Sequence, residues 1–251
     1  MTARPAVAIE GIVTGRQDLG ESDRIFRILS PTAGKLGVFA RGARGPRSRW
    51  AVLDVGVRAN LEVRPGRGGG LATLAAAEVV EARVHLRGGF ETLALAVYAC
   101  EIVGALAREH HAEPTMYGFL ETALLLLDAM DGPPASGFRL GLESKALTYA
   151  GLAPIFTRCV VCGEAVEPRM ELLVSGVRHL HCATEDQGMT LPVSGAWAAA
   201  AEQARRTPLR ELVDHEAPAG PLGGLAAVLE AHLGRPLGAR ALLDAEIGVR
   251  S

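Results

Sequence analysis

The spacing of the apolar residues changes near residue 81, and this change limits the fold more than any other feature of the chain. Before it, apolar and polar residues alternate over short runs, as in Val55–Val63. After it, apolar residues form longer stretches rich in alanine and leucine, beginning with Phe90–Arg108. Alternation is typical of half-buried strands, and long stretches with few β-branched residues are typical of buried helices. The sequence therefore predicts a β domain over residues 1–80 and an α-helical domain over residues 81–251.

Five short runs in the first part have the length and composition of strands, and turn residues separate them. Closing five strands into a barrel removes the exposed sheet edges. The predicted form is an OB-fold, a small barrel whose face and loops bind oligonucleotides; an SH3-like barrel would have a similar strand count. The predicted strands are Val7–Val13, Arg24–Leu29, Lys35–Ala40, Val55–Val63 and Leu71–Val80.

The later apolar stretches predict a bundle of helices, which makes the whole chain an α+β multidomain protein. Pro114 is expected at a helix N-terminus, where proline is tolerated, and the apolar residues at helical spacing are expected in the core. The predicted helices are Phe90–Arg108, a second from Glu113 to before Asp131, Phe138–Ala150, Ala196–Arg206, Gly223–Leu233 and Ala239–Ile247.

The charge is divided unevenly between the two parts. Residues 1–80 carry eleven arginines and Lys35 against seven acidic residues, a net charge of +5. The remaining residues carry 14 basic and 21 acidic side chains, a net charge of −7, which gives the −2 of the whole chain. A basic first third joined to an acidic remainder predicts an anion-binding module attached to a part with another role.

Residues 41–50, which we call the arginine loop, have the sequence Arg-Gly-Ala-Arg-Gly-Pro-Arg-Ser-Arg-Trp. Their glycines and proline oppose a helix, so the segment is predicted to be a loop that holds its arginines outward. Guanidinium groups bind phosphate in a bidentate manner, and an indole offers a base a surface for stacking. Trp50 has two interpretations, base stacking or burial against the barrel. The loop predicts nucleic-acid binding, the alternative being a solvated basic surface.

A cluster of cysteines interrupts the helical part at about residues 155–190. Cys159 and Cys162 are separated by two residues, so both sulfurs can face one metal ion. Cys182 follows, but a second cysteine at the same spacing is missing. Carboxylates and imidazoles also ligate zinc, and the alternatives for the fourth ligand are Glu185, His179 and His181. We favour Glu185 because it keeps the spacing of a second pair; the other interpretation is a degenerate knuckle that binds no metal.

The sequence lacks the signatures of common enzyme active sites, namely GxxxxGK[ST], HExxH and GxSxG, and we expect no enzymatic activity. The apolar run Leu93–Ala107 contains Glu101 and is shorter than the roughly 20 residues that span a bilayer. The N-terminus lacks the apolar core of a signal peptide, and few cysteines are typical of a reducing compartment. We expect a cytoplasmic protein, associated with the nucleoid, with no membrane partner.

Short motifs follow one another in a characteristic order over nearly the whole chain, most densely in the first 80 residues. They are Gly11–Val13, Asp18–Arg24, Gly34–Leu36, Ala40–Arg44, Pro46–Arg49, Leu71–Leu74, Glu78–Glu81, Cys159–Gly163 and His232–Arg235. In this order they resemble the RecO family of bacterial recombination mediators and DNA-annealing proteins. The resemblance implies an N-terminal OB domain and a C-terminal helical domain with, in many members, a zinc-binding insertion. The missing fourth cysteine departs from that pattern.

The resemblance also implies function. It implies binding of single- and double-stranded DNA, annealing of complementary strands, and partnership with RecR and the C-terminal tail of single-strand-binding protein, so that RecA is loaded onto coated strands. The expected DNA-binding residues are Arg16, Arg24, Lys35, Arg41, Arg44, Arg47, Arg49 and Trp50. The expected metal ligands are Cys159, Cys162, Cys182 and Glu185, for zinc. Arg235 and Arg240 are expected to contact the acidic tail. The alternative function is another OB-fold adaptor, associated with RNA or translation.

Overall fold

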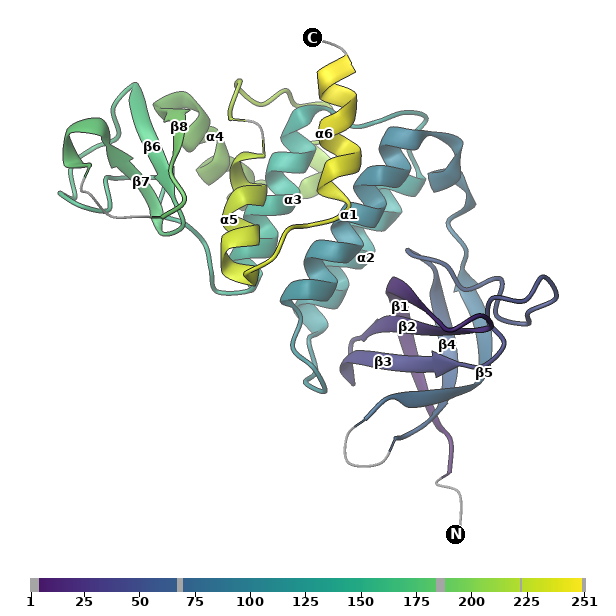
Figure 1. Cartoon of the computed structure of the whole chain (residues 1–251). Helices are drawn as coiled ribbons and strands as arrows, with labels where there is room; N and C mark the ends of the chain where they lie inside the picture. The colour runs from purple at the N-terminus through teal and green to yellow at the C-terminus, as the bar shows by residue number, and fades with distance from the viewer. Residues whose placement is uncertain (1–4, 67–69, 184–187, 222, 250–251) are drawn as a thin grey trace. The chain divides into compact units, whose positions relative to one another are not determined.

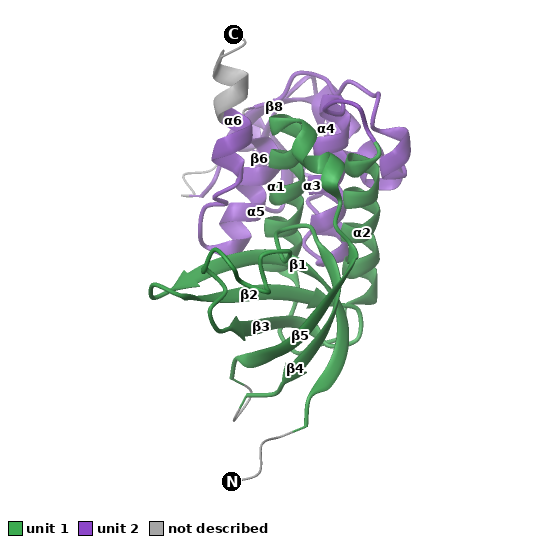
Figure 2. Ribbon diagram, turned by 90° about the vertical axis from the view of Figure 1, so that its right-hand side faces the viewer, with its two compact units in different colours: residues 1–129 green, residues 130–251 purple. Residues whose placement is uncertain are grey.

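The computed structural model describes residues 5–66, 70–183, 188–221 and 223–249. The chain divides into two compact units, residues 1–129 and residues 130–251 (Figure 2). The first contains a β-barrel with two long helices, and the second contains the remaining helices and a small sheet (Figure 1). Within the described ranges, no helix is both long enough and apolar enough to cross a membrane.

The first unit is built on a closed five-stranded barrel with the strand order β1-β2-β3-β5-β4. β1 pairs with β4 through its first half and with β2 through its second half, and β3 runs parallel to β5. This order is that of an OB-fold, so the predicted fold class is confirmed. The strands are β1 (Val7–Leu19), β2 (Asp23–Ser30), β3 (Gly34–Ala40), β4 (Arg58–Arg64) and β5 (Ala72–Glu81).

The alternation of apolar and polar residues that predicted β4 matches the two faces of the strand, one buried in the barrel core and one exposed to solvent. Val57, Ala59, Leu61 and Val63 are buried in the barrel core, while Asn60 and Glu62 are exposed. β4 begins at Arg58 rather than at Val55, because the preceding residues form turns. β1 in turn is longer than predicted: it continues to Leu19, and its register shifts between Val13 and Gly15.

Two helices complete the first unit, α1 (Phe90–Leu106) and α2 (Pro114–Asp128), after a short 3₁₀ turn, η2 (Val84–Gly88). α1 packs against β1, β2 and α2. A close approach at the far end of α1 requires glycine: Gly34 has a φ of 69°, and a Cβ there would lie 2.1 Å from the carbonyl oxygen of His111. The barrel ends at Glu81, yet α1 and α2 share its compact unit, so a domain boundary after residue 80 stays a prediction.

In the second unit, helix α3 packs against α4 and α5. A three-stranded antiparallel sheet of order β7-β6-β8 occupies the predicted insertion, and the sequence analysis did not foresee its strands. Ser194 caps α4, its side chain accepting a hydrogen bond from the backbone of Trp197 (3.1 Å). The elements are α3 (Ser136–Tyr149), β6 (Arg169–Leu173), β7 (Gly176–His179), η3 (Leu180–Cys182), β8 (Leu191–Ser194), α4 (Gly195–Arg206), η4 (Leu209–Glu211), α5 (Gly224–Leu233) and α6 (Arg240–Val249).

Candidate nucleic-acid interface and metal centre

The arginine loop joins β3 to β4 and presents its basic side chains to solvent. Its exposed arginines are Arg41, Arg44, Arg47 and Arg49. Ala43 and Trp50 point the other way and belong to the barrel core. Consecutive turns, with the N–H of Ser48 donating to the oxygen of Gly45 at 2.9 Å, keep the segment compact. The predicted outward display of the arginines is therefore what the structure has.

Trp50 is only 4% exposed. Its indole Nε1 donates a hydrogen bond to the backbone oxygen of Arg41 (3.1 Å), which ties the two ends of the loop together. The guanidinium of Arg49 lies 4.1 Å from the centre of the ring, a cation–π contact. Because the ring is buried, it offers no face on which a base could stack. The assignment of Trp50 to the DNA-contacting set is thus corrected: it anchors the loop in the barrel.

The turn between β1 and β2 holds the arginine loop in place. The backbone N–H of Gly42 donates to the carboxylate of Asp23 (2.8 Å), and that of Arg44 donates to the oxygen of Ser22 (2.9 Å). The bonds from Gly42 and Ser22 hold the pKa of Asp23 below its ordinary value. These contacts join two segments that are about twenty residues apart in sequence into one surface.

Two carboxylates lie among the predicted DNA-binding arginines. Asp18 pairs with Arg24 (2.8 Å) and with Arg44 (3.2 Å), and the hydrogen bond from Arg24 lowers the pKa of Asp18. Asp54 pairs with Arg16 (2.9 Å) and with Arg87 (3.4 Å). Sequence reasoning missed Arg87, which η2 brings to this surface and which lies outside the basic first third.

Lys35 does not lie with these arginines. It stands at the start of β3, whereas the arginine loop follows the end of that strand. Its backbone N–H donates to the oxygen of Arg108 (3.2 Å), and its own oxygen accepts from His110 (3.2 Å). The backbone of Lys35 therefore lies where the barrel meets the segment that follows α1, and contact of its side chain with DNA stays a prediction.

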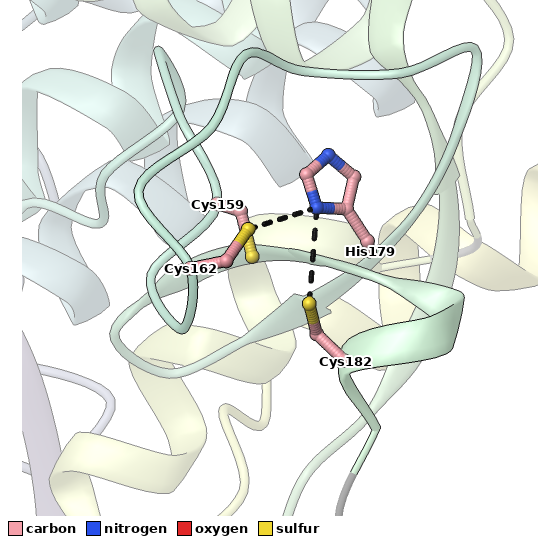
Figure 3. A group of neighbouring side chains, drawn as sticks. All are labelled: Cys159, Cys162, His179 and Cys182. Atoms are coloured by element: carbon pink, nitrogen blue, oxygen red, sulfur yellow. Dashed lines mark hydrogen bonds between the residues drawn. The ribbon is translucent and has the colours of Figure 1, made fainter.

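Four side chains of the second unit converge on one point (Figure 3): Cys159, Cys162, His179 and Cys182. Their ligand atoms all lie within 4.8 Å of one another. The Nδ1 of His179 lies 3.3 Å from the sulfur of Cys162 and 3.9 Å from that of Cys182. Cys159 and His179 are buried, and Cys162 is exposed. This group could hold a metal ion.

Groups around the cluster favour the forms of His179 and Cys159 that bind a metal cation. The Nε2 of His179 lies 2.8 Å from the oxygen of Ala165; a proton on Nε2 donated to that oxygen leaves the lone pair on Nδ1, facing the sulfurs. Burial raises the pKa of the Cys159 thiol, but backbone N–H groups, among them that of Val161 at 3.4 Å, outweigh it and lower the pKa to about 6. A thiolate is the form that binds metal.

The fourth position of the cluster is filled by His179 among the described residues. Glu185, the ligand favoured from the spacing, lies outside the described residues. His181 is exposed and its ring stacks on that of His179, with centroids 4.9 Å apart. Two residues separate His179 from Cys182, just as two residues separate Cys159 from Cys162, so the same spacing counted backward from Cys182 identifies His179.

Of the two arginines expected to contact a partner, Arg240 is engaged within the protein. It pairs with Asp244 (2.9 Å) and with Glu230. A contact between Arg240 and an acidic tail would compete with these carboxylates, and it stays a prediction. Arg235 is exposed and donates a hydrogen bond to the oxygen of Pro236 (3.1 Å).

Comparison with known proteins agrees with this architecture. The family described as Recombination protein O N terminal matches residues 5–83, and the one described as Recombination protein O C terminal matches residues 87–241. "DNA repair protein RecO" of Anaeromyxobacter sp. (strain K) is 36% identical over 96% of this chain and 97% of that protein. The protein of the same name from Myxococcus xanthus (strain DK1622) is 32% identical over 91% of this chain and 93% of its own. The chain belongs to the RecO family.

Proposed function

We propose that this protein acts in DNA repair by recombination, binding single- and double-stranded DNA and annealing complementary strands. With RecR it would help to load RecA onto strands coated by single-strand-binding protein. Membership of a family whose relatives are named for DNA repair supports this role. The observation that best supports DNA binding is that one loop of an OB-fold barrel exposes four arginines: Arg41, Arg44, Arg47 and Arg49.

Annealing needs no covalent chemistry, and the proposed role is non-enzymatic. Two strands repel through their phosphates, and a surface of guanidinium groups neutralises that charge while the strands sample registers. Arg16 and Arg24 extend the charge of the arginine loop along β1 and β2, and Arg87 extends it at η2. Since the contacts are to phosphate, the binding would be independent of sequence.

We also propose that the cluster of Cys159, Cys162, His179 and Cys182 holds zinc in a structural role. Three thiolates and one imidazole are a donor set of closed, four-coordinate zinc sites. Such a site contributes to folding rather than to catalysis. Here the ligands come from a turn, from the end of β7 and from η3, so a shared ion would fix these segments to one another.

For partners, we propose that residues 81–251 bind the acidic tail of single-strand-binding protein, with Arg235 as a contact. This follows from the size of the helical part and from family membership. A peptide with that acidic, apolar-ended sequence should bind the whole protein, and Arg235→Glu should weaken the binding, as measured by fluorescence anisotropy. The protein would work in the cytoplasm, at the nucleoid.

The salt dependence of DNA binding tests the role of the arginine loop. Changing Arg41, Arg44, Arg47 and Arg49 to alanine should flatten the slope of log K against log salt by up to about 3 for single strands, at roughly 0.7 per phosphate contact. The same variant should anneal complementary strands more slowly when single-strand-binding protein coats them. The change should be similar for every DNA sequence, because phosphates carry no sequence information.

The matched control removes four exposed arginines of the second unit: Arg158, Arg169, Arg206 and Arg210. This variant loses the same charge and should change the slope little. A loop variant that keeps the fold by circular dichroism and also keeps the wild-type slope would show that the arginine loop is only a solvated surface.

A further inference from the structure

The arginines beside the loop are paired with the protein's own carboxylates in a repeated arrangement. Asp18 lies between Arg24 and Arg44, at 2.8 and 3.2 Å. Asp54 lies between Arg16 and Arg87, at 2.9 and 3.4 Å. In each case one carboxylate contacts two guanidinium groups, as a phosphate of DNA could.

Asp18 is not required to hold the arginine loop. The loop backbone is fixed by the bond from Gly42 to Asp23, by the bond from Arg44 to the oxygen of Ser22, and by Trp50 in the core. The side chain of Asp18 is 46% exposed and accepts its contacts at the surface. Its negative charge is therefore additional to what the local fold needs.

The negative charge of Asp54 is likewise not needed to hold the local fold. Its Oδ1 accepts a hydrogen bond from the N–H of Val55 (2.8 Å), a contact that an asparagine oxygen would also accept. The charge itself is used only toward Arg16 and Arg87 among the described residues. Arg16 also lowers the pKa of Asp18, behind the larger effects of Arg24 and Arg44, so Arg16 is close enough to couple the two carboxylates electrostatically.

We propose that Asp18 and Asp54 are positioning residues that compete with DNA phosphates for Arg16, Arg24, Arg44 and Arg87, and so keep DNA binding weak enough to be readily reversed. The proposal rests on the proposed function. Carboxylates and phosphates accept the same bidentate bonds from arginine, and an exposed ion pair is weak enough for a phosphate to displace it. The displaced carboxylate then stands unpaired beside the DNA. Reversible binding suits annealing, in which strands must be released after pairing.

Asp18→Asn, Asp54→Asn and the double variant test this competition. Each single variant should bind single-stranded DNA about three- to fivefold more tightly at low salt, in keeping with the strength of exposed ion pairs. Each frees two arginines, so the slope of log K against log salt should steepen by up to about 1.4, and by up to about 2.8 in the double variant. Dissociation of a labelled strand should be slower in all three. Adding Arg44→Gln to Asp18→Asn should reduce the gain, because half of the freed charge is then missing.

The control is the double variant Glu62→Gln, Glu78→Gln, which removes the same charge from exposed barrel positions on β4 and β5. Glu62 pairs with Ala8, ten residues before Asp18 on β1. An equal gain in this control would show that net charge alone is responsible and would overturn the proposal. So would Asp18→Asn and Asp54→Asn variants that bind with wild-type affinity and slope. If the wild-type protein itself bound no DNA, the proposed function would fail and this inference with it, a result distinct from the other two.

Discussion

Trp50 links the arginine loop to the barrel core through a single side chain. Its ring is buried among core residues and its Nε1 donates to the oxygen of Arg41. Trp50→Ala would leave a large cavity and an unpaired carbonyl, so we expect the free energy of unfolding to fall by about 3–5 kcal/mol. Unfolding in urea, followed by circular dichroism, measures this loss.

Trp50→Phe is the matched variant, because it keeps most of the apolar volume and removes only the N–H donor. Its cost should be nearer 1–2 kcal/mol, the range for losing a buried hydrogen bond and some packing. A Trp50→Ala variant with wild-type stability but a lower affinity for DNA would contradict the role in the core and restore base stacking.

Whether the exposure of a single side chain can be predicted from the sequence depends on whether its neighbours in the sequence determine that exposure. The exposure of the loop arginines followed from glycine and proline next to them. The choice between a buried and an exposed Trp50 depends on the fit of the ring against residues of other strands. The place of His179 in the cysteine cluster could be predicted from the sequence, since its spacing from Cys182 repeats that of Cys159 from Cys162.

The cluster of Cys159, Cys162, His179 and Cys182 in the second unit is predicted to bind zinc. Protein purified without chelator should contain about one equivalent of zinc, and Cys159→Ser and His179→Ala should each lose most of it. Because binding of a structural ion contributes to folding, chelation should lower the melting temperature of the wild type and change these two variants little. Elemental analysis and thermal unfolding give the two readouts.

His181→Ala is the control, since His181 is exposed and only stacks on His179. It should keep the metal. Glu185→Ala completes the set, because that residue was favoured from spacing. Metal lost in Glu185→Ala but kept in His179→Ala would assign the fourth ligand to the carboxylate, and wild-type protein free of metal would leave the four side chains as packing residues.

The longer elements could be predicted because their patterns are long. The barrel strands and the six predicted helices agree with the structure to within a few residues at most ends. β6, β7 and β8 could not, because strands of four or five residues show too little alternation and depend on pairing across the insertion. β1 was predicted too short because its polar second half has few apolar residues, although it pairs with β2 up to Leu19.

Where the barrel domain ends depends on contacts across the whole first unit, and not on the local sequence pattern alone. A composition change places its end at residue 80, but polar contacts join the barrel to α2 in the first unit. Buried Arg83 donates to Glu121 (2.5 Å) and to the oxygen of Gly56, and the hydroxyl of Tyr117 donates to Glu10 (2.6 Å). Contacts between segments this far apart in sequence leave no mark in local periodicity.

These contacts predict how fragments of the chain behave. A fragment of residues 1–129 should fold and unfold cooperatively, because it keeps α1 and α2 on the barrel. A fragment of residues 1–83 should be less stable by several kcal/mol, since it loses the partner of the Arg83 guanidinium and the cover that α1 gives to β1 and β2, and unpaired buried charges are costly. Urea unfolding of the two fragments, followed by circular dichroism, measures the difference. Glu121→Gln in the longer fragment tests the cause, because it should account for part of the loss without removing any helix. If residues 1–83 were as stable as residues 1–129, the barrel alone would be the domain, and the boundary after residue 80 would stand.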